Sequence, residues 1–150
     1  MKVVVDTNIV FSGLLNPKSR IGELLIKSKD YFTFYSLESL LEELEEHQQK
    51  ILKISKYSDL EYLEAKSIIL SKINVVDDES IPKECLLKAE SLSTAIDPDD
   101  TIFLALSFNL NAFLWTGDKK VANGLKKLNV DKTISTEDIY KAYLERELNK

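Results

Sequence analysis

Acidic side chains recur at four points of this 150-residue sequence, at or near the predicted boundaries of strands and helices or along one helix face. They are Asp6, Asp100 and Asp118, together with a glutamate run in which Glu42 and Glu43 are both candidates. Crowded carboxylates raise one another's pKa and oppose folding, so a cluster of them usually holds a cation. Oxygen ligands suit Mg²⁺ and Mn²⁺, and ions held in this way activate water and stabilise charge in phosphodiester hydrolysis. The pattern therefore predicts metal-dependent phosphodiester chemistry.

In that chemistry, Asp6, Asp100 and Asp118 would ligate the metal directly or through water. Glu43 would complete the ligand set or orient the attacking water. Each acid also has an ordinary structural use, since aspartates favour turns and helix N-termini, and runs of glutamates are typical of solvated helix faces. Such a structural use readily explains any one of these acids, but it explains all four together less well.

The apolar pattern predicts strands and helices in alternation. Three consecutive valines precede Asp6, so residues 2–6 are expected to form a buried strand at the centre of a sheet. Strands are predicted over residues 2–6, 32–35, 73–76, 112–116 and 133–134. Helices are predicted over about residues 21–28, 37–52 with Ser36 as N-cap, 58–72, 82–92, 100–108, 121–128 and 136–148.

This alternation predicts an α/β fold with a parallel sheet and helices on both of its faces. Binding sites in such sheets form outside the carboxyl ends of the strands. Asp6 ends one predicted strand, and Asp118 follows another by two residues. Asp100 begins the helix that leads into the second of these strands. Chain order alone therefore places three acids at one edge of the sheet.

The composition narrows the functions that the chain can have. Its length suits one domain over residues 1–150, and no apolar run is long enough to cross a bilayer. Cys85 and His47 are the only residues of their types, which excludes disulfides and cysteine/histidine zinc sites within one subunit. The net charge of −5 counts against a nucleic-acid substrate, although a divalent cation would offset part of it locally. An acid follows only three apolar residues in Met1–Asp6, so we expect neither a signal peptide nor a membrane anchor here, and we expect a cytoplasmic protein.

Four segments together resemble the PIN-domain family, which comprises small metal-dependent nucleases and includes the VapC toxins of toxin–antitoxin pairs. They are Val4–Asn8, Leu40–His47, Asp97–Leu106 and Leu114–Asp118. The resemblance covers essentially the whole sequence. It implies a three-layer α/β/α domain with a central parallel sheet, often dimeric, that cleaves single-stranded or structured RNA with Mg²⁺ or Mn²⁺.

By this resemblance, Glu43 is the second acid rather than Glu42, because the acid of the family directly precedes an apolar residue, here Leu44. The expected function is that of an RNA endonuclease and toxin, with a protein antitoxin as partner and a homodimer as assembly. The residues implied as catalytic are Asp6, Glu43, Asp100 and Asp118, and those implied as their supports are Asn8, Asp97, Asp99 and Thr116.

Two other functions stay open. A non-catalytic PIN-like module would bind RNA or a protein and keep its acids only as helix caps. A metal-dependent phosphatase acting on small phosphate esters would also use a strand-terminal aspartate such as Asp6. That chemistry normally has a second aspartate two residues later, where this sequence has Asn8.

Overall fold

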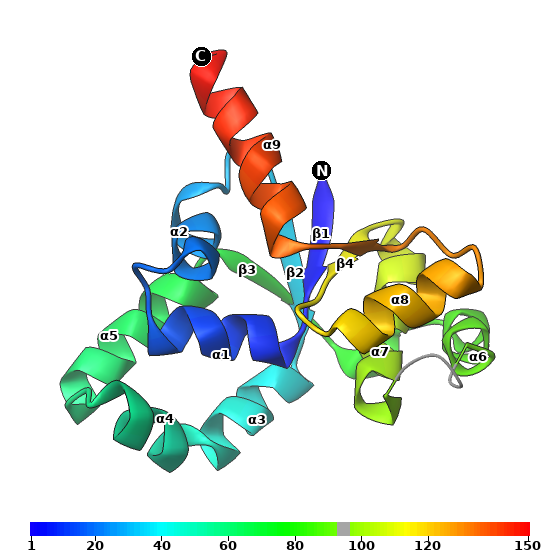
Figure 1. Ribbon diagram of the computed structural model, residues 1–150. Helices are drawn as coiled ribbons and strands as arrows, with labels where there is room; N and C mark the ends of the chain where they lie inside the picture. Colours follow the sequence, from blue (N-terminus) through cyan, green and yellow to red (C-terminus); the bar gives the residue numbers. More distant parts are fainter. Residues whose placement is uncertain (93–96) are drawn as a thin grey trace.

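The part of the chain described by the computed structural model, residues 1–92 and 97–150, is built around a five-stranded parallel sheet with strand order β3-β2-β1-β4-β5 (Figure 1). All five predicted strands are present, and the strand of consecutive valines is central, as its composition predicts. The strands are β1 (Lys2–Val5), β2 (Thr33–Leu37), β3 (Ile73–Val76), β4 (Phe113–Trp115) and β5 (Thr133–Ile134).

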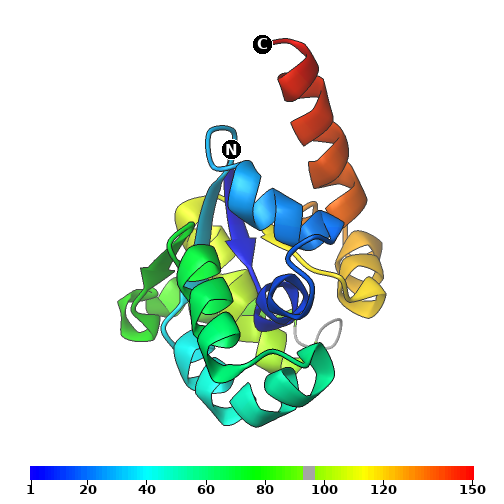
Figure 2. The ribbon, with the colours of Figure 1, turned by 90° about the vertical axis from the view of Figure 1, so that its left-hand side faces the viewer.

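Helices cover both faces of the sheet and complete the three layers of the predicted α/β fold (Figures 1 and 2). Within the two described ranges, none of them has the length and apolar character that a membrane span requires. They are α1 (Thr7–Leu15), α2 (Arg20–Lys27), α3 (Ser39–Glu46), α4 (Gln48–Ser55), α5 (Asp59–Leu70), α6 (Lys83–Glu90), α7 (Pro98–Leu110), α8 (Lys119–Lys127) and α9 (Thr136–Leu148), with a short 3₁₀ helix η1 (Asp78–Ser80) before α6.

The strand β1 divides the core into two clusters, because successive side chains of a strand point to opposite faces of the sheet. Val3 and Val5 pack with apolar residues of α1 to α5 and α9. Val4 packs on the other face with residues of α6, α7 and α8. All three valines are fully buried, so β1 is held from both sides and its carboxyl end is fixed in place.

The structure corrects the predicted helix over residues 37–52. Leu37 lies in β2, where it pairs with Val76, and α3 and α4 are separate helices that meet at His47. Ser36 is not an N-cap: its buried hydroxyl donates a hydrogen bond of 2.9 Å to the carbonyl of Val5. This hydrogen bond joins β2 to the carboxyl end of β1.

The helix α1 was not predicted from the sequence. Asp6 caps it, since one carboxylate oxygen accepts a hydrogen bond of 3.0 Å from the backbone N–H of Ile9. At Gly13, a β-carbon would lie 2.8 Å from a methyl group of Leu25, so the missing side chain allows α1 to pack closely against α2. The chain therefore turns directly from the central strand into a buried helix.

Candidate metal centre

The strand order brings the carboxyl ends of β1 and β4 together. These strands are neighbours, and Val5 pairs with Trp115, so Asp6 and Thr116 follow paired residues. From β1 the chain continues to β2 and β3 on one side, whereas β4 and β5 lie on the other. This reversal of strand order is the point where ligands bind in open parallel sheets.

Asp6 is the most buried acid of the candidate site, with 4% of its surface exposed. Burial raises the pKa of the Asp6 carboxyl, because the charged form loses solvation, and the negative charge of Asp118 raises it further. Hydrogen bonds act in the opposite direction on this pKa; their donors are the Ile9 backbone, the Thr116 hydroxyl and the Asn8 backbone. Asp6 therefore presents a carboxylate that is oriented by several donors but poorly solvated.

Asp100 lies in the first turn of α7 and is half-buried. Its pKa is raised from 3.8 to about 6, first by burial and then by the negative charges of Asp6, Asp97, Asp118 and Asp99, in that order. Asp6, Asp100 and Asp118 follow or begin three different elements, yet their charges interact. The sequence placed these acids at one edge of the sheet, and the effect of the Asp6 and Asp118 charges on the pKa of Asp100 agrees with that placement.

Asp118 is exposed and caps α8, where it accepts a hydrogen bond of 2.8 Å from the backbone N–H of Lys120. Its own backbone N–H donates to the Thr116 hydroxyl at 3.1 Å. Because this hydroxyl also hydrogen-bonds the Asp6 carboxylate, the buried Thr116 side chain links the two acids.

Glu43 is not one of the charges that raise the pKa of Asp6 or Asp100 among the described residues. It lies on α3 with a half-buried side chain, whereas Glu42 is exposed. The charges of Asp6 and Asp118 therefore act on Asp100, whereas the fourth proposed acid lies on a neighbouring element, since α3 contacts α1.

The residues implied as supports have different surroundings. Asp97 caps α7 by accepting a hydrogen bond of 2.9 Å from the backbone of Asp99, and both side chains are exposed. Asn8 is exposed, and its backbone N–H, rather than its side chain, contacts Asp6. Thr116 alone among these supports has a buried side chain that joins two of the acids.

Capping explains part of this arrangement. Asp6, Asp97 and Asp118 each cap a helix, as their ordinary structural use predicts. Asp100 accepts no such capping hydrogen bond, although it stands half-buried beside like charges. In the described part of the chain, the only ion pair within 4.0 Å joins Lys150 and Glu147, so no basic side chain neutralises the cluster. A divalent cation is the ligand that would relieve this repulsion.

The donor set of the cluster fits a hard cation. Carboxylate and hydroxyl oxygens are the ligands that Mg²⁺ prefers, and the chain has them at three strand or helix ends. Across residues 1–92 and 97–150, no three acidic, histidine or cysteine side chains are close enough to ligate one ion together. Mg²⁺ commonly keeps several waters and binds only one or two carboxylates directly, so these acids suit an ion held partly through water.

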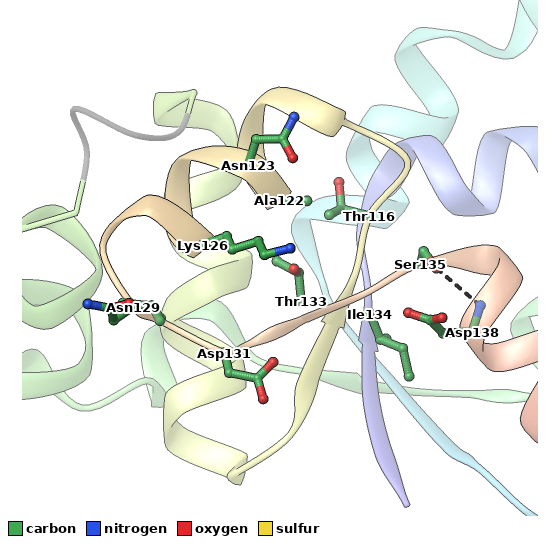
Figure 3. Close-up of a pocket in the computed structure, with 11 residues that line it drawn as sticks. Thr116, Ala122, Asn123, Lys126, Asn129, Asp131, Thr133, Ile134, Ser135 and Asp138 are labelled. Atoms are coloured by element: carbon green, nitrogen blue, oxygen red, sulfur yellow. Dashed lines mark hydrogen bonds between the residues drawn. The ribbon is translucent and has the colours of Figure 1, made fainter.

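A polar cavity of about 570 Å³ adjoins the cluster between α8, β5 and the start of α9 (Figure 3). Thr116 lines this cavity as well as contacting Asp6. Its remaining polar residues come from a helix, a loop, a strand and a second helix, and no sequence spacing marks them as a group. Only the folded arrangement shows that the acidic cluster has a cavity beside it.

Comparisons with known proteins agree with this architecture. The chain is similar in structure to VapBC2 from Rickettsia felis, solved bound to a DNA fragment from its promoter: TM-score 0.61, 18% identity, 90% of this chain and 97% of that chain covered. It is also similar to PAE2754 from Pyrobaculum aerophilum, with TM-score 0.63 and 12% identity over 97% of this chain and 96% of that one.

A third similar structure is a PilT N-terminus domain protein, SSO1118, from Sulfolobus solfataricus, with TM-score 0.50 and 17% identity over 97% and 95% of the two chains. No curated protein matches the sequence. The family described as PIN domain matches residues 4–140, which include Asp6, Glu43, Asp100 and Asp118. The chain therefore belongs to the PIN-domain family.

Proposed function

We propose that the chain is a divalent-metal-dependent endoribonuclease that forms one nuclease domain over residues 1–150. One observation carries the proposal: burial, and after it the negative charges of Asp6 and Asp118 beside the carboxyl ends of β1 and β4, raise the pKa of Asp100 to about 6, and no cation of the described chain pairs with these acids. Membership of a family of nucleases supports the same chemistry.

In this proposal, Asp6, Asp100 and Asp118 hold Mg²⁺ or Mn²⁺, directly or through water. The bound metal supplies activation of water and stabilisation of the charge that develops on the phosphoryl oxygens. Glu43, on the neighbouring helix α3, would orient the attacking water or complete the ligand set. Thr116 orients Asp6 and Asp118, while Asn8, Asp97 and Asp99 support the helix ends that carry the acids.

A cleavage assay with matched variants tests the proposal. Purified protein is incubated with RNA and Mn²⁺, and the assay is repeated with chelator and with Asp6→Asn. Asparagine caps a helix about as well as aspartate, so this change removes the charge and keeps the cap. Asp77→Asn is the control, because Asp77 caps η1 in the same way, at 3.0 Å from the Glu79 N–H, outside the candidate site.

We expect cleavage by the wild type and by Asp77→Asn, with activity lost in chelator and in Asp6→Asn. Equal cleavage with and without metal, or by Asp6→Asn, would reject the metal-dependent nuclease.

The proposal extends to a role as the toxin of a toxin–antitoxin pair, with an antitoxin as protein partner, a homodimer as assembly and the cytoplasm as location. Its support is the structural similarity to the VapBC2 complex. The adjacent reading frame should encode a small antitoxin that co-purifies with the chain and suppresses cleavage. Light scattering of the purified chain tests the dimer. If the product of the adjacent reading frame neither binds nor inhibits the chain, the toxin role is rejected but the nuclease function is not.

A non-catalytic module is the second candidate, because Asp6, Asp97 and Asp118 all serve as helix caps. In that case the acids need no ion. Calorimetry with millimolar Mn²⁺ separates the two candidates: the nuclease binds the ion, and the module does not.

A further inference from the structure

The cavity beside the metal centre has a lining suited to a neutral polar ligand. Lys126 of α8 contributes one positive charge, and Asp131 and Asp138 contribute two negative charges. The lining also contains the neutral hydrogen-bonding side chains of Asn123, Asn129, Thr133 and Ser135. Its volume of about 570 Å³ lies in the range of small-molecule binding pockets.

The charges in this lining favour the nucleoside part of a nucleotide over its phosphate. Ionised carboxylates only accept hydrogen bonds, so Asp131 and Asp138 suit ligand groups that donate them. Ribose hydroxyls and base N–H groups are donors of this kind, whereas a phosphate would be repelled by the two acids. A phosphate is better placed at Lys126, whose side chain in Figure 3 reaches across the cavity toward Thr133.

The position of the cavity relates it to the reacting phosphate. Thr116 forms part of the cavity wall and also hydrogen-bonds the Asp6 carboxylate and the Asp118 backbone. A group in the cavity is therefore one side chain away from the acids of the metal centre. This position is suited to a nucleotide that is joined directly to a phosphate at those acids.

We infer that this cavity, between α8, β5 and α9, binds an unpaired nucleotide of the RNA next to the cleaved phosphodiester, with Lys126 on the adjoining phosphate and Asp138 accepting from the ribose or base. The inference rests on the proposed function and deepens it, since it assigns to this cavity one nucleotide of the RNA substrate. A paired base cannot leave its helix to enter a cavity without the cost of unpairing.

Two pairs of neighbouring residues allow matched substitutions. Lys126 lines the cavity and Lys127, next on the same exposed helix end, does not. Asp138 lines the cavity and turns its carboxylate toward it, while Glu137 in the same first turn of α9 does not line it. Within each pair the charge removed is the same, so only the position relative to the cavity differs.

Binding is measured by fluorescence anisotropy of a short labelled single-stranded RNA, in an Asp100→Asn background that spares the RNA from cleavage. Lys126→Ala should weaken binding about tenfold, as expected for loss of one charge-assisted contact, and Lys127→Ala less than about twofold. Lys126→Ala should also lower the slope of log affinity against log salt by about 0.7, the value for one phosphate contact on a single strand.

Asp138→Ala gives the sharper readout. Removing a negative charge tightens RNA binding if only long-range electrostatics act, and Glu137→Ala should show that small effect. If the carboxylate accepts a hydrogen bond from the nucleotide, Asp138→Ala instead weakens binding, by about fivefold. Thermal unfolding of each variant confirms that it remains folded.

Equal effects within both pairs, or equal affinity for the same RNA annealed to its complement, would overturn the cavity assignment. A different result would reject the nuclease proposal alone. In that case the RNA stays intact with Mn²⁺, but the variants differ in anisotropy as expected, and the cavity remains an RNA-binding site. If the wild type cleaves RNA and the KM is unchanged in Lys126→Ala and Asp138→Ala, the cavity assignment is rejected and the nuclease proposal stands.

Discussion

Asp6 and Thr116 lie side by side at the carboxyl edge of the sheet, because the residues before them, Val5 and Trp115, are paired across β1 and β4. The Thr116 hydroxyl hydrogen-bonds the Asp6 carboxylate and accepts the Asp118 backbone N–H. A threonine directly after a strand thus orients one acid of the candidate site and fixes the loop that carries another.

Replacing Asp100 with asparagine should stabilise the metal-free protein near neutral pH. The pKa of Asp100 is about 6 in the folded protein and 3.8 ordinarily, so the folded state binds more protons between these values. The free energy of unfolding therefore falls as pH rises from about 4 to 6, and the penalty is complete above that window. The neutral asparagine side chain avoids this penalty, with a gain of about 1 kcal/mol after allowance for solvent screening.

Urea denaturation in chelator measures this effect at pH 7.5 and at pH 4. The advantage of Asp100→Asn should be present at the higher pH and absent at the lower. A variant less stable than the wild type at pH 7.5 would mean that the Asp100 charge is not under repulsion.

Affinity for Mn²⁺ should fall in acid. Protonation neutralises Asp100, whose pKa is about 6, and a neutral carboxyl is a poor ligand for a cation. Between pH 7.5 and pH 5 the affinity should decrease about tenfold, the factor expected for one proton released on binding. Calorimetry at the two pH values checks this, and the remaining binding of Asp100→Asn should vary less. If the affinity for Mn²⁺ is constant over this pH range, Asp100 does not ligate the ion.

Removing the Thr116 hydroxyl should weaken metal binding without unfolding the protein. Thr116→Val keeps the shape of the side chain but loses the contacts to Asp6 and to the Asp118 backbone. Loss of a group that orients metal ligands costs about tenfold or more in metal affinity or activity. Thr116→Ser keeps the hydroxyl and should retain most of the affinity. Equal Mn²⁺ affinities for the valine and serine variants would show that the hydroxyl does not position the acids.

The buried Trp115 should be important for stability. Its indole N–H donates a hydrogen bond of 2.9 Å to the Thr136 hydroxyl, which ties β4 to the start of α9. Trp115→Phe loses this bond and leaves a void, at a cost of about 2–3 kcal/mol, whereas Thr136→Val loses chiefly the bond, at about 1 kcal/mol. Denaturant titrations give both values. If the two variants are equally stable, the indole ring contributes nothing beyond its hydrogen bond.

The sequence was sufficient to predict the sheet and to place Asp6, Asp100 and Asp118 where the charges of the first and third act on the second. A run of valines identifies a strand buried on both faces, and parallel connections leave Asp6 and Asp118 at the same edge. The position of Asp100 can be predicted as well, because the helix that carries it leads into β4. These features depend on local pattern and chain order, which a single sequence contains.

Other features depend on contacts between distant segments. The apolar residues of Thr7–Leu15 surround the whole helix, so α1 lacks the periodic contrast that identifies an amphipathic helix. Leu40, Leu44 and Ile51 keep helical spacing across His47, although the chain changes helix there. The cavity combines residues of α8, β5 and α9, and its existence follows only from their packing.

Binding of Mn²⁺ to wild type, Asp6→Asn, Asp118→Asn and the capping control Asp77→Asn, measured by calorimetry at pH 7.5, tests the shared metal site most directly. We predict that the wild type and Asp77→Asn bind with equal affinity and that each of the other two loses most of it, although all three substitutions keep their helix caps. Undiminished binding in both Asp6→Asn and Asp118→Asn would contradict the account, because these carboxylates would then be caps and nothing more.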